Sequence, residues 1–155
     1  MAAKSRSNRW IRRYPKKTAE FHGHLSLLLV IDVRTGFIGL RELELKESTE
    51  KLHVTASLKY SVPVSCVLDE IQVTTGYTFG NKKLTSKNAS GIAAEFRLPD
   101  RKRVTAAVNQ TFFNRLKKKL LSEKVSNHEM QDLARLVASM PEEDSFVIER
   151  EQRFS

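Results

Sequence analysis

The longest regular pattern of apolar positions lies between residues 22 and 43. Its members recur at helical spacing, and they are Leu25, Leu28, Leu29, Val33, Phe37 and Leu40. Further apolar residues widen this stripe until it nearly encircles the first half of the segment. The pattern predicts a central helix that is buried on most of its surface.

Alternation of apolar and polar residues predicts three strands, near residues 52–59, 92–98 and 103–109. Pro99 and Asp100 separate the last two, which indicates a β-hairpin. A polar stretch, residues 81–88, precedes this hairpin. Near the end of the chain, residues 146–148 suit an edge strand.

Three shorter segments have helical patterns. Residues 65–75 predict a short helix that Gly76 ends, and residues 111–124 predict an amphipathic helix with a basic surface at 115–119. Residues 127–140 predict a third, with Ser126 or Asn127 as its cap and Pro141 beyond its end.

These elements together predict an α+β fold. We expect a mixed or antiparallel sheet, packed by the long central helix and the C-terminal helices. A chain of 155 residues with 40% hydrophobic residues suits one domain of ordinary core size. We expect that domain to span residues 20–155.

The formal charge of +9 is concentrated in an N-terminal arm, residues 1–19. Seven of the positive charges lie in this arm, with no acid before Glu20: Lys4, Arg6, Arg9, Arg12, Arg13, Lys16 and Lys17. The rest of the chain is close to neutral. The arm has little apolar material to fold around, so it is a candidate disordered segment and a candidate contact for nucleic acid.

The single cysteine, Cys66, excludes an intramolecular disulfide and a zinc site made of several thiolates. A reducing compartment follows as the simpler expectation, so we expect a cytoplasmic protein. Charged residues from Asp32 onward interrupt the apolar run well short of the roughly 20 residues of a membrane span. We therefore expect no membrane partner.

Two histidines flank a glycine where the central helix should begin, at His22, Gly23 and His24. Histidine is the commonest metal ligand, and glycine allows a close approach of the backbone. Side chains two residues apart share a face only in extended backbone, so both act together only in a loop or at a strand end. The alternative interpretation is a helix cap with a solvated ring.

Cys66 falls at the predicted start of the short helix. Backbone N–H groups at a helix start lower a thiol pKa, which would make Cys66 a better ligand or nucleophile. The alternative is a small buried hydrophobic residue.

Two long segments give the chain a resemblance to a known family. FHGHLSLLLVIDVRTGFIGLREL at residues 21–43 and SCVLDEIQVTTGYTFGNKKL at 65–84 closely resemble the motifs of the FmdE family, named for a component of formylmethanofuran dehydrogenase, as does MPEEDSF at 140–146. The resemblance covers roughly residues 20–149. It implies an FmdE-like fold and an association with an enzyme that reduces carbon dioxide onto methanofuran in methanogens, which makes the chain archaeal in type.

The resemblance also implies a site. Its metal ligands would be His22, His24 and Cys66, a set that suits zinc or another divalent metal. A surrounding cleft for a small anionic ligand would be formed by Ser26, Asp69, Gln72, Thr75, Gly76, Tyr77, Thr78, Gly80 and Lys82.

Two positions depart from the family pattern. Ser26 stands where the family has the cysteine of a CPG tripeptide, and a serine hydroxyl is a poor metal ligand, so we expect weaker metal binding. Tyr77 stands where many members carry cysteine, and we expect its bulky phenol to fill part of the pocket. The cysteine-rich zinc module found at the end of many relatives has no counterpart in this sequence.

The leading functional hypothesis is an FmdE-family protein with a His/Cys cleft, linked to formylmethanofuran dehydrogenase or one-carbon metabolism. Nothing in the sequence names a reaction. The alternative is a homodimeric binding module with a degenerate site, which would contact nucleic acid through its basic arm and the basic surface at 115–119.

Overall fold

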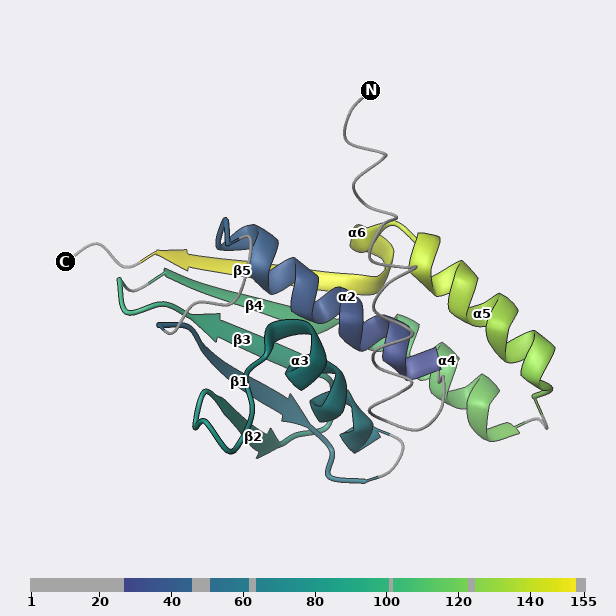
Figure 1. The fold of residues 1–155 in the computed structure, drawn as a ribbon. Helices are drawn as coiled ribbons and strands as arrows, with labels where there is room; N and C mark the ends of the chain where they lie inside the picture. The colour runs from purple at the N-terminus through teal and green to yellow at the C-terminus, as the bar shows by residue number, and fades with distance from the viewer. Residues whose placement is uncertain (1–26, 46–50, 62–63, 101, 123–124, 153–155) are drawn as a thin grey trace.

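The computed structural model describes residues 27–45, 51–61, 64–100, 102–122 and 125–152. Five α-helices, one 3-10 helix and five strands lie in these ranges (Figure 1). In chain order they are α2 (Leu27–Glu42), β1 (His53–Leu58), η1 (Val64–Cys66), α3 (Val67–Thr75), β2 (Leu84–Asn88), β3 (Ala93–Arg97), β4 (Lys102–Val108), α4 (Gln110–Ser122), α5 (Asn127–Ser139), α6 (Glu142–Ser145) and β5 (Phe146–Gln152).

The five strands form one mixed sheet in the order β2-β1-β3-β4-β5. Only β1 and β2 are parallel, and the other neighbouring pairs are antiparallel. The predicted α+β class, hairpin and edge strand are therefore confirmed. The edge strand β5 is longer than expected, because it continues beyond residue 148 to Gln152 along β4.

Strand β2 lies within the polar stretch 81–88, where no strand was predicted. Leu84 is its one buried residue, and the remaining residues are exposed or partly exposed, as expected for an edge strand. Parallel pairing with β1 requires a crossover, and α3 provides it. The strand is thus determined by a long-range partner rather than by its own sequence pattern.

The central helix α2 is buried along nearly its whole length. Its apolar residues Leu29, Ile31 and Val33 have no exposed surface. It contacts α3, α5, β3 and β4, so the wide apolar stripe is matched by neighbours on several sides. The predicted central helix is confirmed over the residues that the structure describes.

Glycines in α2 permit two of these close contacts. A Cβ built on Gly36 would lie 2.3 Å from the Thr74 hydroxyl of α3, and one on Gly39 would lie 2.4 Å from the Phe96 ring of β3. Real Cβ atoms do not approach other atoms so closely. The backbone of α2 therefore lies nearer to α3 and to the sheet than any larger residue would allow.

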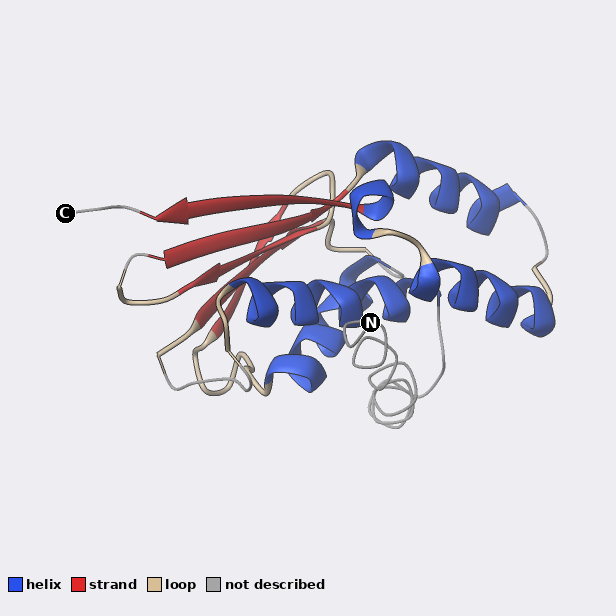
Figure 2. Cartoon of the chain, turned by 90° about the horizontal axis from the view of Figure 1, so that it is seen from above, coloured by secondary structure: helices blue, strands red, loops and turns tan. Residues whose placement is uncertain are grey.

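Helices α2 and α3 lie on one face of the sheet, and no described helix covers the opposite face (Figure 2). Strand burial agrees, because residues such as Val54, Ala56 and Leu58 are buried and their neighbours along β1 are more exposed. Helices α4 and α5 form an antiparallel pair beyond one end of the sheet. Ser126 caps α5 through a capping box with Glu129, as predicted.

Arginines of α2 connect this helix to the C-terminal elements. The buried guanidinium of Arg34 donates to the Val137 carbonyl of α5 at 2.6 Å and lies 5.3 Å from the centre of the Phe146 ring. Arg41 forms two hydrogen bonds with Glu142, at 2.5 and 2.8 Å. The guanidinium of Arg34 therefore interacts with α5 and with the Phe146 ring, and not with α3.

Within the described part of the chain, none of the helices has both the length and the apolar character needed to span a membrane.

We expect Gly39→Ala to destabilise the fold by about 1–3 kcal/mol, because the added methyl group overlaps the fully buried Phe96 ring. The free energy of unfolding in urea measures this loss. Gly80→Ala is the matched control, since its Cβ would meet only the Thr78 hydroxyl at 3.6 Å. Equal stability of the two variants would contradict the close packing of α2 on β3.

Candidate functional site

Cys66 lies at the junction of two helical segments. It ends η1 and is the N-cap residue of α3, although its side chain makes no capping hydrogen bond. The thiol is free and partly exposed. The predicted position at a helix start is confirmed.

The expected effect on the thiol pKa is wrong. Burial raises the pKa of Cys66, and the nearby charges of Asp69, Asp32 and Glu70 raise it further. Burial and neighbouring carboxylates both disfavour the charged thiolate. Without a bound cation, Cys66 is therefore a neutral thiol near pH 7.

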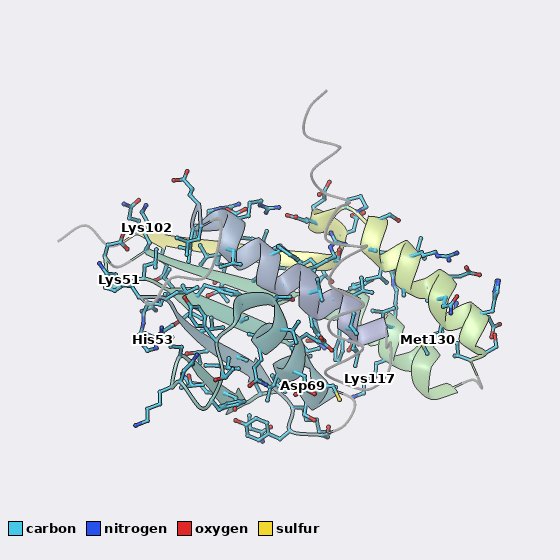
Figure 3. The ribbon with its side chains drawn as sticks, in the orientation of Figure 1. Lys51, His53, Asp69, Lys102, Lys117 and Met130 are labelled. Atoms are coloured by element: carbon cyan, nitrogen blue, oxygen red, sulfur yellow. The ribbon has the colours of Figure 1, made fainter. Side chains whose placement is uncertain are left out.

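Asp69 and Gln72 are carried by α3, and both are partly exposed. Asp69 lies in the first turn of the helix, three residues after Cys66 (Figure 3). Residues three apart on a helix are surface neighbours, and the charge of Asp69 acts on the Cys66 thiol. The structure thus brings these two predicted site residues together.

The loop after α3 uses many of its own polar groups. The Asn81 side-chain oxygen accepts from the Thr78 backbone N–H at 3.0 Å and from the Lys83 N–H at 3.1 Å. The Thr78 hydroxyl accepts from the Asn81 N–H at 3.2 Å. Thr75 donates to the Ile71 carbonyl at 2.5 Å. An anion bound to these groups would have to replace bonds that the loop already makes.

Gly76 and Gly80 play different roles in this loop. Gly76 has a positive φ of 70° and ends α3, donating its N–H to the Gln72 carbonyl, as the predicted glycine stop requires. Gly80 is exposed and has room for a side chain. Lys82 also adopts a positive φ of 61° and is exposed at the surface.

Tyr77 is a core residue with 3% of its surface exposed. The Lys83 ammonium lies 5.4 Å from the centre of its ring, which is a cation–π contact. The predicted filling of space by the larger phenol is consistent with this position in the hydrophobic core.

Two acids that the sequence did not indicate as site residues lie inside the α2–α3 contact. Asp32 has no exposed surface and Glu70 has 1% exposed, and neither carboxyl group has a hydrogen-bond partner among the described residues. Burial raises the pKa of Glu70 to about 8, with a further contribution from Asp69. Burial and the charge of Glu70 also raise the pKa of Asp32.

The register of the two helices explains why these acids meet. Gly36 faces Thr74, and one turn earlier on each helix stand Asp32 and Glu70. The two helices therefore run parallel, and one further turn back lies Cys66 at the end of η1, which contacts α2 near its start. Asp32 did give one signal in the sequence: it is an acid within a helix that is apolar on nearly every side.

His22, His24 and Ser26 lie outside the described residues, so their predicted roles stay predictions. Within the described ranges, no group of three or more His, Cys, Asp and Glu side chains is arranged to hold a metal ion. The residues that the structure does bring together are Cys66, Asp69, Asp32 and Glu70.

A separate open groove of about 490 Å³ has a lining that includes none of these residues. It is lined by Lys59, Asn88, Ala89, Ser90 and Lys117. Lys117 belongs to the predicted basic surface of α4, and Figure 3 shows it near the end of the molecule where α2 begins. None of the predicted cleft residues lines this groove.

The fold is an α+β domain in which a buried central helix and a shorter parallel helix pack on a mixed sheet. A crystal structure of a tungsten formylmethanofuran dehydrogenase FmdE-like protein from Syntrophus aciditrophicus is similar in fold, with a TM-score of 0.55 and 19% identity. The match covers 91% of this chain and 71% of that one.

The family model described as FmdE, molybdenum formylmethanofuran dehydrogenase operon, matches residues 21–147. The chain therefore belongs to the FmdE family, as the sequence motifs predicted. A comparison with curated proteins gave no match.

We expect the protein to lose stability as the pH rises from about 5 to about 8. Unfolding releases the Glu70 proton above its ordinary pKa of 4.5, whereas the folded protein keeps that proton up to about pH 8. The folded state then binds more protons, and one such carboxyl lowers the free energy of unfolding by up to about 1.4 kcal/mol per pH unit. Urea unfolding at several pH values, with a chelator present, measures the slope.

Glu70→Gln removes this ionisation and should reduce the slope, and the part that stays reflects the raised pKa of Asp32. Glu143→Gln, at an exposed position of α6, is the matched control and should keep the wild-type slope. A slope that Glu70→Gln leaves unchanged would show that Glu70 titrates at an ordinary pKa.

The neutral thiol leads to a second expectation: iodoacetamide should alkylate Cys66 more slowly in the folded protein than in the unfolded chain. Asp69→Asn should accelerate the reaction, because it removes a charge that raises the thiol pKa. The chain has one cysteine, so mass spectrometry reports this site alone. Asp144→Asn in α6 serves as the control, and acceleration in both variants would refute a specific effect of Asp69.

Proposed function

We propose that this chain is a metal-binding member of the FmdE family, with a divalent ion held where α2 and α3 begin. The proposed ligands are His22, His24 and Cys66, and zinc is the metal that suits two imidazoles and one thiolate best. Ser26 contributes no thiolate, so water or a small anionic ligand completes the coordination.

The parallel register of α2 and α3 is the observation that carries this proposal. It puts Cys66 beside the start of α2, and the FHGH motif directly precedes that helix in the sequence. Three residues separate His24 from Leu27, and an extended segment of that length spans about 10 Å. The proposal requires that the chain before α2 bring both imidazoles to the Cys66 sulfur.

The electrostatics around Cys66 suit a cation. Three acidic groups, Asp69, Asp32 and Glu70, act on this thiol, and each disfavours a thiolate when it is ionised. A divalent ion reverses this balance, because it stabilises both the thiolate and the ionised form of nearby carboxyl groups. Asp69 is well placed to orient a ligand from outside the coordination sphere.

The family description gives the proposal its wider context. It associates members with the molybdenum formylmethanofuran dehydrogenase operon. We extend this association to the chain as a role in one-carbon metabolism, in which the metal cleft would bind a small ligand. Catalysis, homodimer formation and nucleic-acid binding stay predictions.

Untagged protein of full length should bind about one zinc ion, as expected for a single three-residue site. Removing a ligand in His24→Ala or Cys66→Ser should weaken binding by at least about tenfold. Calorimetric titration of the metal-free protein measures the affinity, and elemental analysis of purified protein measures occupancy.

His53→Ala is the matched control, because His53 is exposed at the start of β1 and should leave zinc binding unchanged. The proposal fails if the wild-type protein binds no zinc, or if neither His24→Ala nor Cys66→Ser reduces the affinity.

A further inference from the structure

The buried carboxyl groups of Asp32 and Glu70 form a second feature that the His/Cys site does not use. All four of their oxygen atoms are inaccessible to solvent and have no hydrogen-bond partner among the described residues. Leaving buried carboxylates uncompensated is strongly unfavourable, so such groups are normally paired, protonated or bound to a metal. The arrangement therefore requires either that the pair be protonated or that it hold a cation.

Neighbouring hydroxyl groups do not compensate these acids. Thr35 donates to the Ile31 carbonyl at 2.9 Å, and Thr74 donates to the Glu70 carbonyl at 2.9 Å. Thr75 likewise donates to the Ile71 carbonyl. Each hydroxyl hydrogen is thus used by the backbone of its own helix rather than by a carboxyl group.

No basic side chain described on α2 or α3 compensates them either. Arg34 donates to α5 and lies over Phe146, whereas Arg41 pairs with Glu142 and Glu42. Helix α3 has no lysine or arginine. The other titratable groups close to the pair, Asp69 and Cys66, are acidic.

We propose that Asp32 and Glu70 form a binding site for a hard divalent cation inside the α2–α3 contact, one helical turn deeper than Cys66. Carboxylate oxygens are the ligands that Mg²⁺ and Mn²⁺ prefer, and these two side chains present four such oxygen atoms. Any water that completes the coordination has to enter with the ion, because these oxygen atoms have no contact with solvent.

This second site is distinct from the His/Cys site in its chemistry. Oxygen ligands favour hard ions, whereas imidazole and thiolate favour zinc. The proposal accordingly does not depend on zinc binding by His22, His24 and Cys66. A cation between Asp32 and Glu70 would also hold α2 and α3 together at the level below the Gly36–Thr74 contact.

Titration of metal-free protein with Mn²⁺, followed by electron paramagnetic resonance of the unbound ion, tests the site. The wild-type protein should bind Mn²⁺, and Asp32→Asn and Glu70→Gln should each lower the affinity by at least about tenfold. Cys66→Ser and the exposed control Glu143→Gln should bind as the wild type does. Circular dichroism verifies that each variant is folded.

Paramagnetic broadening of amide NMR signals in the wild-type protein gives a second measurement that needs no variant. Broadening centred on residues near 32 and 70 supports the site, and broadening confined to the exposed acids of α6 overturns it. Absence of Mn²⁺ binding overturns the proposal, and the pair is then held neutral by protons. If Cys66→Ser loses Mn²⁺ binding, the ion binds at the His/Cys site, and the proposal of a separate Asp32–Glu70 site is wrong.

Discussion

The close parallel packing of α2 against α3 is the contact on which the candidate site depends. Gly36 allows Thr74 to approach the α2 backbone, and this contact fixes which residues face each other one and two turns earlier. Asp32 is thereby placed near Glu70, and Cys66 near the start of α2. A residue larger than glycine at position 36 would separate the helices and weaken every one of these relations.

Helix α2 also connects the sheet to the C-terminal helix α5. On one side, Gly39 brings α2 onto the Phe96 ring of the sheet, and on another Arg34 binds the end of α5 and the Phe146 ring. Because α2 is enclosed by α3, α5 and the sheet, a charge on its α3 side has no route to solvent. The burial of Asp32 follows from this central position, and its raised pKa is the electrostatic result.

Family membership establishes the kind of domain, whereas the proposed chemistry depends on particular residues of this chain. The match over residues 21–147 and the similar fold of the Syntrophus protein establish what kind of domain it is. They do not define a reaction, because related folds support different activities. The chemistry proposed for the chain comes from its own residues: a thiol among acids at the helix starts, and two unpartnered carboxyl groups beneath it.

The sequence by itself determined most of the elements and one part of the site. Helical spacing in α2, alternation in β1, β3 and β4, and the Ser126 cap each depend on neighbouring residues, so local patterns were sufficient. The FmdE motifs likewise identified the family and indicated Cys66 and Asp69. Only the tertiary structure decided the strand β2, the raised pKa of Cys66 and the meeting of Asp32 with Glu70. These three features arise between segments distant in the sequence, where pairing, burial and charge depend on packing that no local pattern encodes.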